Sequence, residues 1–176
     1  CDVFLASGTV KIVTLLAAYK EMEEGKLQKD SRYVLKQSDY IGGQKVNEKS
    51  FGALEYLHEG TELTVEDLYR LSIAVSDNVA FNILYRMLGE ETINQTLDAL
   101  GFTKTRLHRG IYDRQQQNRR IENFVSVEEM ANLFYRMDKG QVISGQASRE
   151  MLELFKQHQQ NSIMPYYFDE DLEIAH

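Results

Sequence analysis

The chain has 176 residues, 43% of them hydrophobic, which is enough to bury a core and suits one domain, or one domain and part of another. Its formal net charge of -7 argues against nucleic acid and anionic membrane surfaces as partners. Charges interrupt every apolar stretch, so the sequence contains no transmembrane segment.

The first predicted element is a helix from about Ser7 to Glu24, with apolar residues at helical spacing and Gly25 as its terminator. Gly8 and Lys11 lie three residues apart near its start, which places them on one helix face. A serine at position 8 would complete a Ser-x-x-Lys motif, in which desolvation lowers the pKa of the lysine and lets it take a proton from the hydroxyl. Glycine has no hydroxyl, so the motif lacks its nucleophile.

Residues 27–60 are predicted to be irregular, with one short helix around residues 53–57. Thr64 and Asp67 then have the pattern of a capping box, in which aspartate replaces the usual acid. This pattern predicts the start of a second long helix, which runs toward Ser76.

The tripeptide Ser76-Asp77-Asn78 interrupts an otherwise apolar helical stretch. Such tripeptides often cap helices or form turns, but three polar residues in apolar sequence need a further reason. The Ser76 hydroxyl could relay a proton to a leaving group, and the Asn78 amide could orient a bound carbonyl and contact Lys11. The tripeptide therefore supplies groups that the first motif needs.

The remainder of the chain is predicted to be mainly helical, with little strand signal and no repeat. The expected helices continue to Leu88 and then cover residues 91–100, residues 126–139 with Ser126 as cap, and residues 148–159, before an aromatic segment at residues 164–168.

Metal and phosphate sites are not predicted. The Gly42-Gly43 pair lacks the third glycine and the Lys-Ser/Thr of a phosphate loop. The histidines are scattered without a cysteine or carboxylate at metal-ligand spacing: His58, His108, His158 and His176. We therefore expect no cofactor and no metal ion.

The segment that starts at Phe4 resembles the nucleophile helix of class A β-lactamases and related penicillin-recognising serine hydrolases, and the Ser-Asp-Asn tripeptide resembles their second motif. In that family an aromatic residue is common four positions before the nucleophile. Phe4 therefore sets the register and places Gly8 at the nucleophile position. Ser7 lies one residue before this position and is the alternative nucleophile. Otherwise, its hydroxyl would cap the start of the helix.

The resemblance covers about residues 4–176 and implies a mainly α fold, namely the all-helical part of the β-lactamase/transpeptidase-like α+β fold, in a single domain over residues 1–176. The family's third motif, Lys-Thr/Ser-Gly on a strand, does not occur, and residues 171–176 resemble the lead-in to that strand. We therefore expect the N-terminal strands and the C-terminal motif-bearing strands to be absent and the antiparallel sheet to be largely missing. The resemblance also implies a secreted or extracytoplasmic protein.

In these β-lactamases, deacylation depends on a glutamate. This glutamate lies on an ω-like loop and activates the hydrolytic water. The corresponding residues 108–123 do not match the family pattern. Asp113 and Glu122 are the carboxylates in this segment, and each is either a candidate base or a solvated loop charge. Rapid turnover of β-lactams is therefore not expected, even with a serine at position 8.

The leading hypothesis is a β-lactamase-like serine hydrolase that acts on β-lactams or D-Ala-D-Ala-type amides and is inactive because Gly8 replaces the nucleophile. Lys11 would be the general base, Ser76 the proton relay and Asn78 the amide that orients the substrate. The alternatives are a non-catalytic domain that binds or senses penicillin or peptidoglycan stem peptides, and a D-Ala-D-Ala carboxypeptidase or transpeptidase. The sequence does not determine the oligomeric state.

Overall fold

The computed structural model describes residues 2–40, 51–159 and 174–175. The glycine pair, the aromatic segment at residues 164–168 and most of residues 171–176 lie outside this part. In chain order the elements, with η for a 3-10 helix, are β1 (Val3–Leu5), η1 (Ser7–Thr9), α1 (Val10–Glu23), β2 (Arg32–Val34), η2 (Gln37–Asp39), η4 (Leu54–Tyr56), β3 (Glu62–Thr64), α2 (Val65–Ala74), α3 (Asn78–Leu88), α4 (Glu90–Ala99), α5 (Arg114–Asn118), β4 (Phe124–Ser126), α6 (Val127–Asp138) and α7 (Gly145–Lys156).

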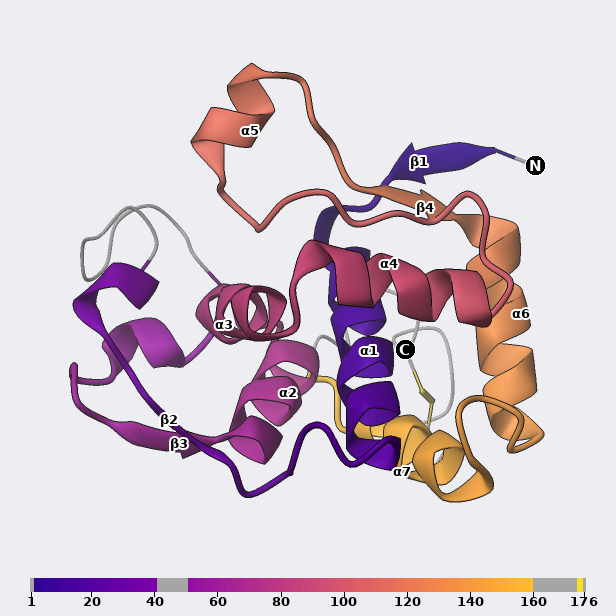
Figure 1. The fold of residues 1–176 in the computed structure, drawn as a ribbon, viewed down its shortest axis with the longest axis horizontal. Coiled ribbons are helices and arrows are strands. Elements are labelled where there is room, and N and C mark those ends of the chain that lie inside the picture. Colours follow the sequence, from indigo (N-terminus) through magenta and orange to yellow (C-terminus); the bar gives the residue numbers. More distant parts are fainter. Residues whose placement is uncertain (1, 41–50, 160–173, 176) are drawn as a thin grey trace.

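Helix α1 runs through the centre of the molecule, and α2, α3 and α4 pack against it (Figure 1). Most of its residues are buried, and Leu16, Ala17 and Ala18 have no exposed surface. Burial of a leucine side chain stabilises a fold by ~1.5–3 kcal/mol, so packing on several sides fixes α1 firmly. The N-terminal end of α1, which carries Lys11, is thereby held against α2 and α3.

Helices α2 and α3 begin at caps formed by short polar side chains. The Thr64 hydroxyl accepts from the Asp67 amide at 3.0 Å, and the Asp67 carboxylate accepts from the Thr64 amide at 2.8 Å, which is the predicted capping box. Helix α2 ends at Ala74 and α3 begins at Asn78, so the Ser-Asp-Asn tripeptide forms the junction between two helices. Asp77 caps α3 by accepting from the Ala80 amide at 2.8 Å.

The strands form two small antiparallel pairs. Strand β1 pairs with β4, with Phe4 opposite Val125, and β2 pairs with β3. A backbone bond of 2.9 Å from the Ala6 amide to the Asn123 carbonyl extends the first pair toward η1. The prediction of a mainly α fold with little sheet is confirmed for the described residues, since helices dominate and each sheet has two strands.

Two helices differ from the sequence prediction. Helix α7 begins at Gly145 because Ser144 caps it, accepting from the Ala147 amide at 3.1 Å. The predicted first residue, Ser148, is buried in the helix, and its hydroxyl bonds both backbone groups of Val142 at 2.9–3.0 Å. Helix α5 was not predicted, because five polar residues show no apolar periodicity.

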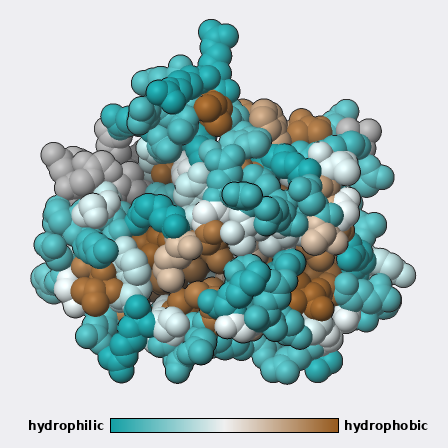
Figure 2. Space-filling view, viewed as in Figure 1, coloured by the Kyte–Doolittle hydropathy of each residue, from teal (hydrophilic) through white to brown (hydrophobic). Residues whose placement is uncertain are grey.

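The face of the molecule in Figure 2 is mostly hydrophilic, with smaller hydrophobic patches between the hydrophilic residues. In the part of the chain that the structure describes, every helix is too short or too polar to cross a bilayer.

Candidate active site

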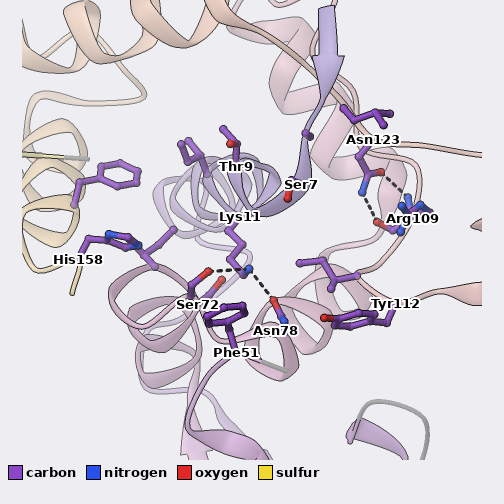
Figure 3. A pocket seen from close by; sticks show the side chains of 18 of the residues that line it. Ser7, Thr9, Lys11, Phe51, Ser72, Asn78, Arg109, Tyr112, Asn123 and His158 are labelled. Carbon is purple, nitrogen blue, oxygen red and sulfur yellow. Dashed lines mark hydrogen bonds between the residues drawn. The ribbon is translucent and has the colours of Figure 1, made fainter. Parts of the chain in front are cut away.

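The two sequence motifs meet at a cavity of about 1140 Å³. The start of α1 and the junction between α2 and α3 form its floor, and Phe51 and Tyr112 lie on either side of Asn78 (Figure 3). The lining includes Ser7, Gly8, Lys11, Ser76, Asn78 and Glu122. Residues 67 positions apart in the sequence thus contribute to one surface.

Lys11 links the two motifs directly. Its Nζ donates to the Ser76 Oγ at 3.1 Å and to the Asn78 Oδ1 at 2.8 Å. The residue is only 5% exposed, and this burial lowers the pKa of its amine from 10.5 to about 8. The nearby Asp77 carboxylate acts in the opposite direction but is the smaller influence on the pKa. A neutral lysine amine, the form that can accept a proton, is therefore accessible near neutral pH.

Gly8 leaves an open space beside this amine. A Cβ built on Gly8 would lie 3.9 Å from the Lys11 Nζ and 4.0 Å from the Ser76 Oγ, which are ordinary contact distances. Gly8 does not have a left-handed φ, so a residue with a side chain fits its backbone. A serine side chain at this position would place its hydroxyl within reach of both groups.

The backbone is strained on both sides of this space. Ser7 has φ 45° and Ser76 has φ 54°, values in the left-handed region that typically cost ~1–3 kcal/mol for a residue with a side chain. Ser7 lines the cavity and is exposed, but within the described residues it makes no hydrogen bond to Lys11 or Ser76. The structure therefore brings Gly8, Lys11 and Ser76 together and leaves Ser7 at their edge.

Asp77 is fully buried and fixes the second motif. Its carboxylate accepts hydrogen bonds of 2.6–2.8 Å from the amides of Ala53, Leu54 and Ala80. A Cβ on Gly52, whose φ is 131°, would come within 2.3 Å of the Asp77 carboxylate, so only glycine allows this approach. The neighbouring Phe51 carbonyl accepts from the Asn78 amide at 3.0 Å. These contacts hold Asn78 against Lys11.

The two carboxylates predicted as candidate bases lie in different places. Glu122 lines the cavity and forms an ion pair with Arg109, whose Nε is 3.1 Å from the Glu122 Oε2. Asp113 caps α5, accepting from the Gln116 amide at 3.0 Å, and lines a separate cavity of about 220 Å³. The structure therefore brings Glu122 to the main cavity and not Asp113.

Residues 108–123 are held beside the cavity by asparagine side chains. Asn82 on α3 bonds both backbone groups of Ile111, at 2.8 and 3.0 Å, and Ile111 lines the cavity. The Asn123 Oδ1 accepts from the amides of His108 and Arg109 at 2.7 and 3.0 Å. These asparagines position the wall of the site opposite α7.

Comparison with known proteins decides the family. The sequence model of the beta-lactamase enzyme family matches residues 2–176. This chain belongs to the beta-lactamase enzyme family. No curated protein matches it.

Solved structures of the family have the same fold. A β-lactamase from Sphaerobacter thermophilus DSM 20745 is 30% identical, with a TM-score of 0.79 over 90% of this chain and 57% of that one. PBP-A is 23% identical, with a TM-score of 0.82 over 99% and 62%, and a β-lactamase from Chitinophaga pinensis DSM 2588 is 17% identical, with a TM-score of 0.84 over 99% and 64%. The chain thus spans 57–64% of the length of these three relatives.

The sequence indicated the short motifs but not the residues whose contacts lie far away in the sequence. Asn82 had one usable signal, a polar residue within an apolar helix. Asn123 and the pairing of Arg109 with Glu122 had none, because their partners are 12 to 15 residues away in an irregular segment.

Proposed function

We propose that this β-lactamase family member carries an acyl-transfer site for β-lactams or D-Ala-D-Ala-type amides in which Gly8 occupies the nucleophile position. The observation that supports the proposal is the space beside Gly8, whose Cβ position lies within 4.0 Å of both the Lys11 Nζ and the Ser76 Oγ. The other groups of the site are hydrogen-bonded to one another, so the hydroxyl is the group that these motifs lack.

With a hydroxyl at position 8, the neutral Lys11 amine accepts its proton as the oxygen attacks the carbonyl carbon. Ser76 shares a hydrogen bond with Lys11 and passes a proton to the leaving nitrogen. Asn78 offers its side-chain amide to the substrate while its oxygen holds Lys11. Glu122, already paired with Arg109, is poorly placed to activate water, so the acyl-enzyme is expected to persist.

The relatives support this chemistry by name. Two are β-lactamases, and a point mutant of PBP-A, 23% identical to this chain, was solved as an acyl-enzyme complex with penicillin-G. For the whole protein we propose the same acyl-transfer activity, the same substrates and an extracytoplasmic location.

Labelling with a fluorescent penicillin tests the proposal. Gly8→Ser is expected to form a hydroxylamine-sensitive ester, and adding Lys11→Ala is expected to slow its formation by about 10²–10⁴-fold, the usual contribution of a general base. The matched control is Gly8→Ala, which fills the same space without a hydroxyl. Absence of any ester on a folded Gly8→Ser chain would contradict the proposal.

Gly8 itself favours a second function, a non-catalytic domain that binds penicillins or peptidoglycan stem peptides. Such a domain would keep the cavity and need no hydroxyl. Calorimetry with a stem peptide ending in D-Ala-D-Ala should then show saturable binding that Asn78→Ala abolishes, while Gly8→Ser stays unreactive.

The pairing of Glu122 with Arg109 favours a D-Ala-D-Ala carboxypeptidase or transpeptidase over a β-lactamase, since neither needs fast hydrolysis of a penicilloyl ester. Release of D-alanine from a stem peptide by Gly8→Ser would distinguish this enzyme from a β-lactamase.

A further inference from the structure

The Lys11 amine in the unchanged chain has one open direction. A neutral amine carries two hydrogens and one lone pair, and both hydrogens are used in the bonds to Ser76 and Asn78 at 3.1 and 2.8 Å. The space beside Gly8, whose Cβ position is 3.9 Å from the Nζ, borders the cavity, and no side chain of the described residues fills it. A carbonyl carbon can therefore approach the amine where a serine oxygen would otherwise intervene.

We propose that Lys11 is itself the nucleophile of the unchanged chain, and that it is acylated by strained lactams that enter the cavity beside Gly8. The inference rests on the proposed function, because it needs the same substrate class in the same cavity. It goes beyond that function by assigning a reaction to the chain that has no serine at position 8.

The reaction needs no further reactant. The neutral Nζ attacks the lactam carbonyl carbon, a bond between Nζ and this carbon forms, and the bond from the carbon to the ring nitrogen breaks. One proton leaves the Nζ and one proton reaches the ring nitrogen, through the Ser76 hydroxyl that already bonds the Nζ. The products are an amide on Lys11 and an opened ring with a secondary amine, so atoms and charges balance.

The local environment favours Lys11 over exposed lysines. Its pKa is about 8, so about a tenth of the amine is neutral at pH 7, whereas a lysine with an ordinary pKa of ~10.4 has fewer than about one in a thousand neutral. The amide product resists hydrolysis, unlike the ester formed on serine. The chain would thus bind one lactam permanently and act as a covalent trap.

Tryptic mapping after incubation with benzylpenicillin tests the inference on the unchanged chain. Acylation blocks cleavage after Lys11, so a peptide of residues 1–20 carrying the penicilloyl group is expected, and the adduct should survive hydroxylamine. At pH 7, labelling of Lys11 should exceed that of the exposed Lys26 about tenfold or more. Its rate should level off above pH 8, while labelling of Lys26 should keep rising toward pH 10.

Two variants complete the test. Lys11→Arg should remove the labelled peptide, because a guanidinium stays charged, and Ser76→Ala should slow labelling about tenfold or more, as expected for a lost proton relay.

Equal labelling of Lys11 and Lys26, or parallel pH profiles, would overturn the inference. Both results come from the unchanged chain, so they do not depend on the folding of a variant. If Gly8→Ser still forms its ester in that case, the proposed function stands; if neither reaction occurs, both fail.

Discussion

Burial of Lys11 favours the neutral form of its amine in the folded chain, at pH values where an unfolded lysine is charged. The hydrogen bonds to Ser76 and Asn78 keep the amine in the cavity despite this cost. Burial of a charged lysine destabilises the folded chain. A lysine that is nevertheless buried at the centre of a hydrogen-bonded motif is typical of a functional site.

The pH dependence of stability should show this cost. The pKa of Lys11 falls from 10.5 unfolded to about 8 folded, so between these values the unfolded chain binds more protons and the free energy of unfolding rises with pH. Lys11→Met lacks this rise. Its stability relative to the unchanged chain should therefore fall by about 3 kcal/mol between pH 7 and pH 10.5, at ~1.4 kcal/mol per pH unit.

Urea unfolding of both chains at several pH values measures this difference. All other titratable groups are common to both chains, so their contributions cancel in the comparison. Parallel stability curves over this range would show that the pKa of Lys11 is not lowered.

Two helices hold one irregular segment through equivalent contacts. Asn82 on α3 bonds both backbone groups of Ile111 at 2.8 and 3.0 Å, and Asn94 on α4 bonds both groups of Leu107 at 2.7 and 3.1 Å. Ile111 lines the main cavity and Leu107 does not. The Asn82 contact therefore lies beside the proposed site, and the Asn94 contact is its matched control away from the cavity.

Removal of either asparagine side chain should cost about 1–3 kcal/mol, because two backbone groups lose their partner. Asn82→Ala should speed hydrogen exchange of the Ile111 amide and, with Gly8→Ser, reduce acylation by penicillin. Asn94→Ala should lose similar stability, with faster exchange at Leu107 and little change in acylation. Equal loss of acylation in both variants would mean that the wall at Ile111 has no specific role.

Local sequence signals predicted the elements well and distant contacts poorly. The Thr64 capping box and the spacing of Gly8 and Lys11 depend on neighbouring residues, so they are readable in the sequence. The start of α7 was misplaced because Ser144 and Ser148 are equally good caps in sequence, and only tertiary contacts of Ser148 decide between them. Asn82 stood out as a polar residue within an apolar helix, but its contact with Ile111 could not be predicted because the two residues lie 29 positions apart.

For the whole molecule, the proposed site depends on the packing of three helices. Lys11 is carried by α1, and Ser76 and Asn78 lie at the junction of α2 and α3, so the core that holds these helices together also sets the distances in the site. The space beside Gly8 exists only in this assembled state. We therefore expect a serine at position 8 to react only in the folded chain.

The most direct test is to locate the penicilloyl group on the Gly8→Ser chain after reaction with benzylpenicillin. Trypsin releases residues 1–11 as one peptide, and fragment ions separate position 7 from position 8. We predict a hydroxylamine-sensitive ester at position 8, present on the folded chain and absent after denaturation in urea. An ester on Ser7, on Ser76 or on no residue would contradict the assignment of Gly8 to the nucleophile position.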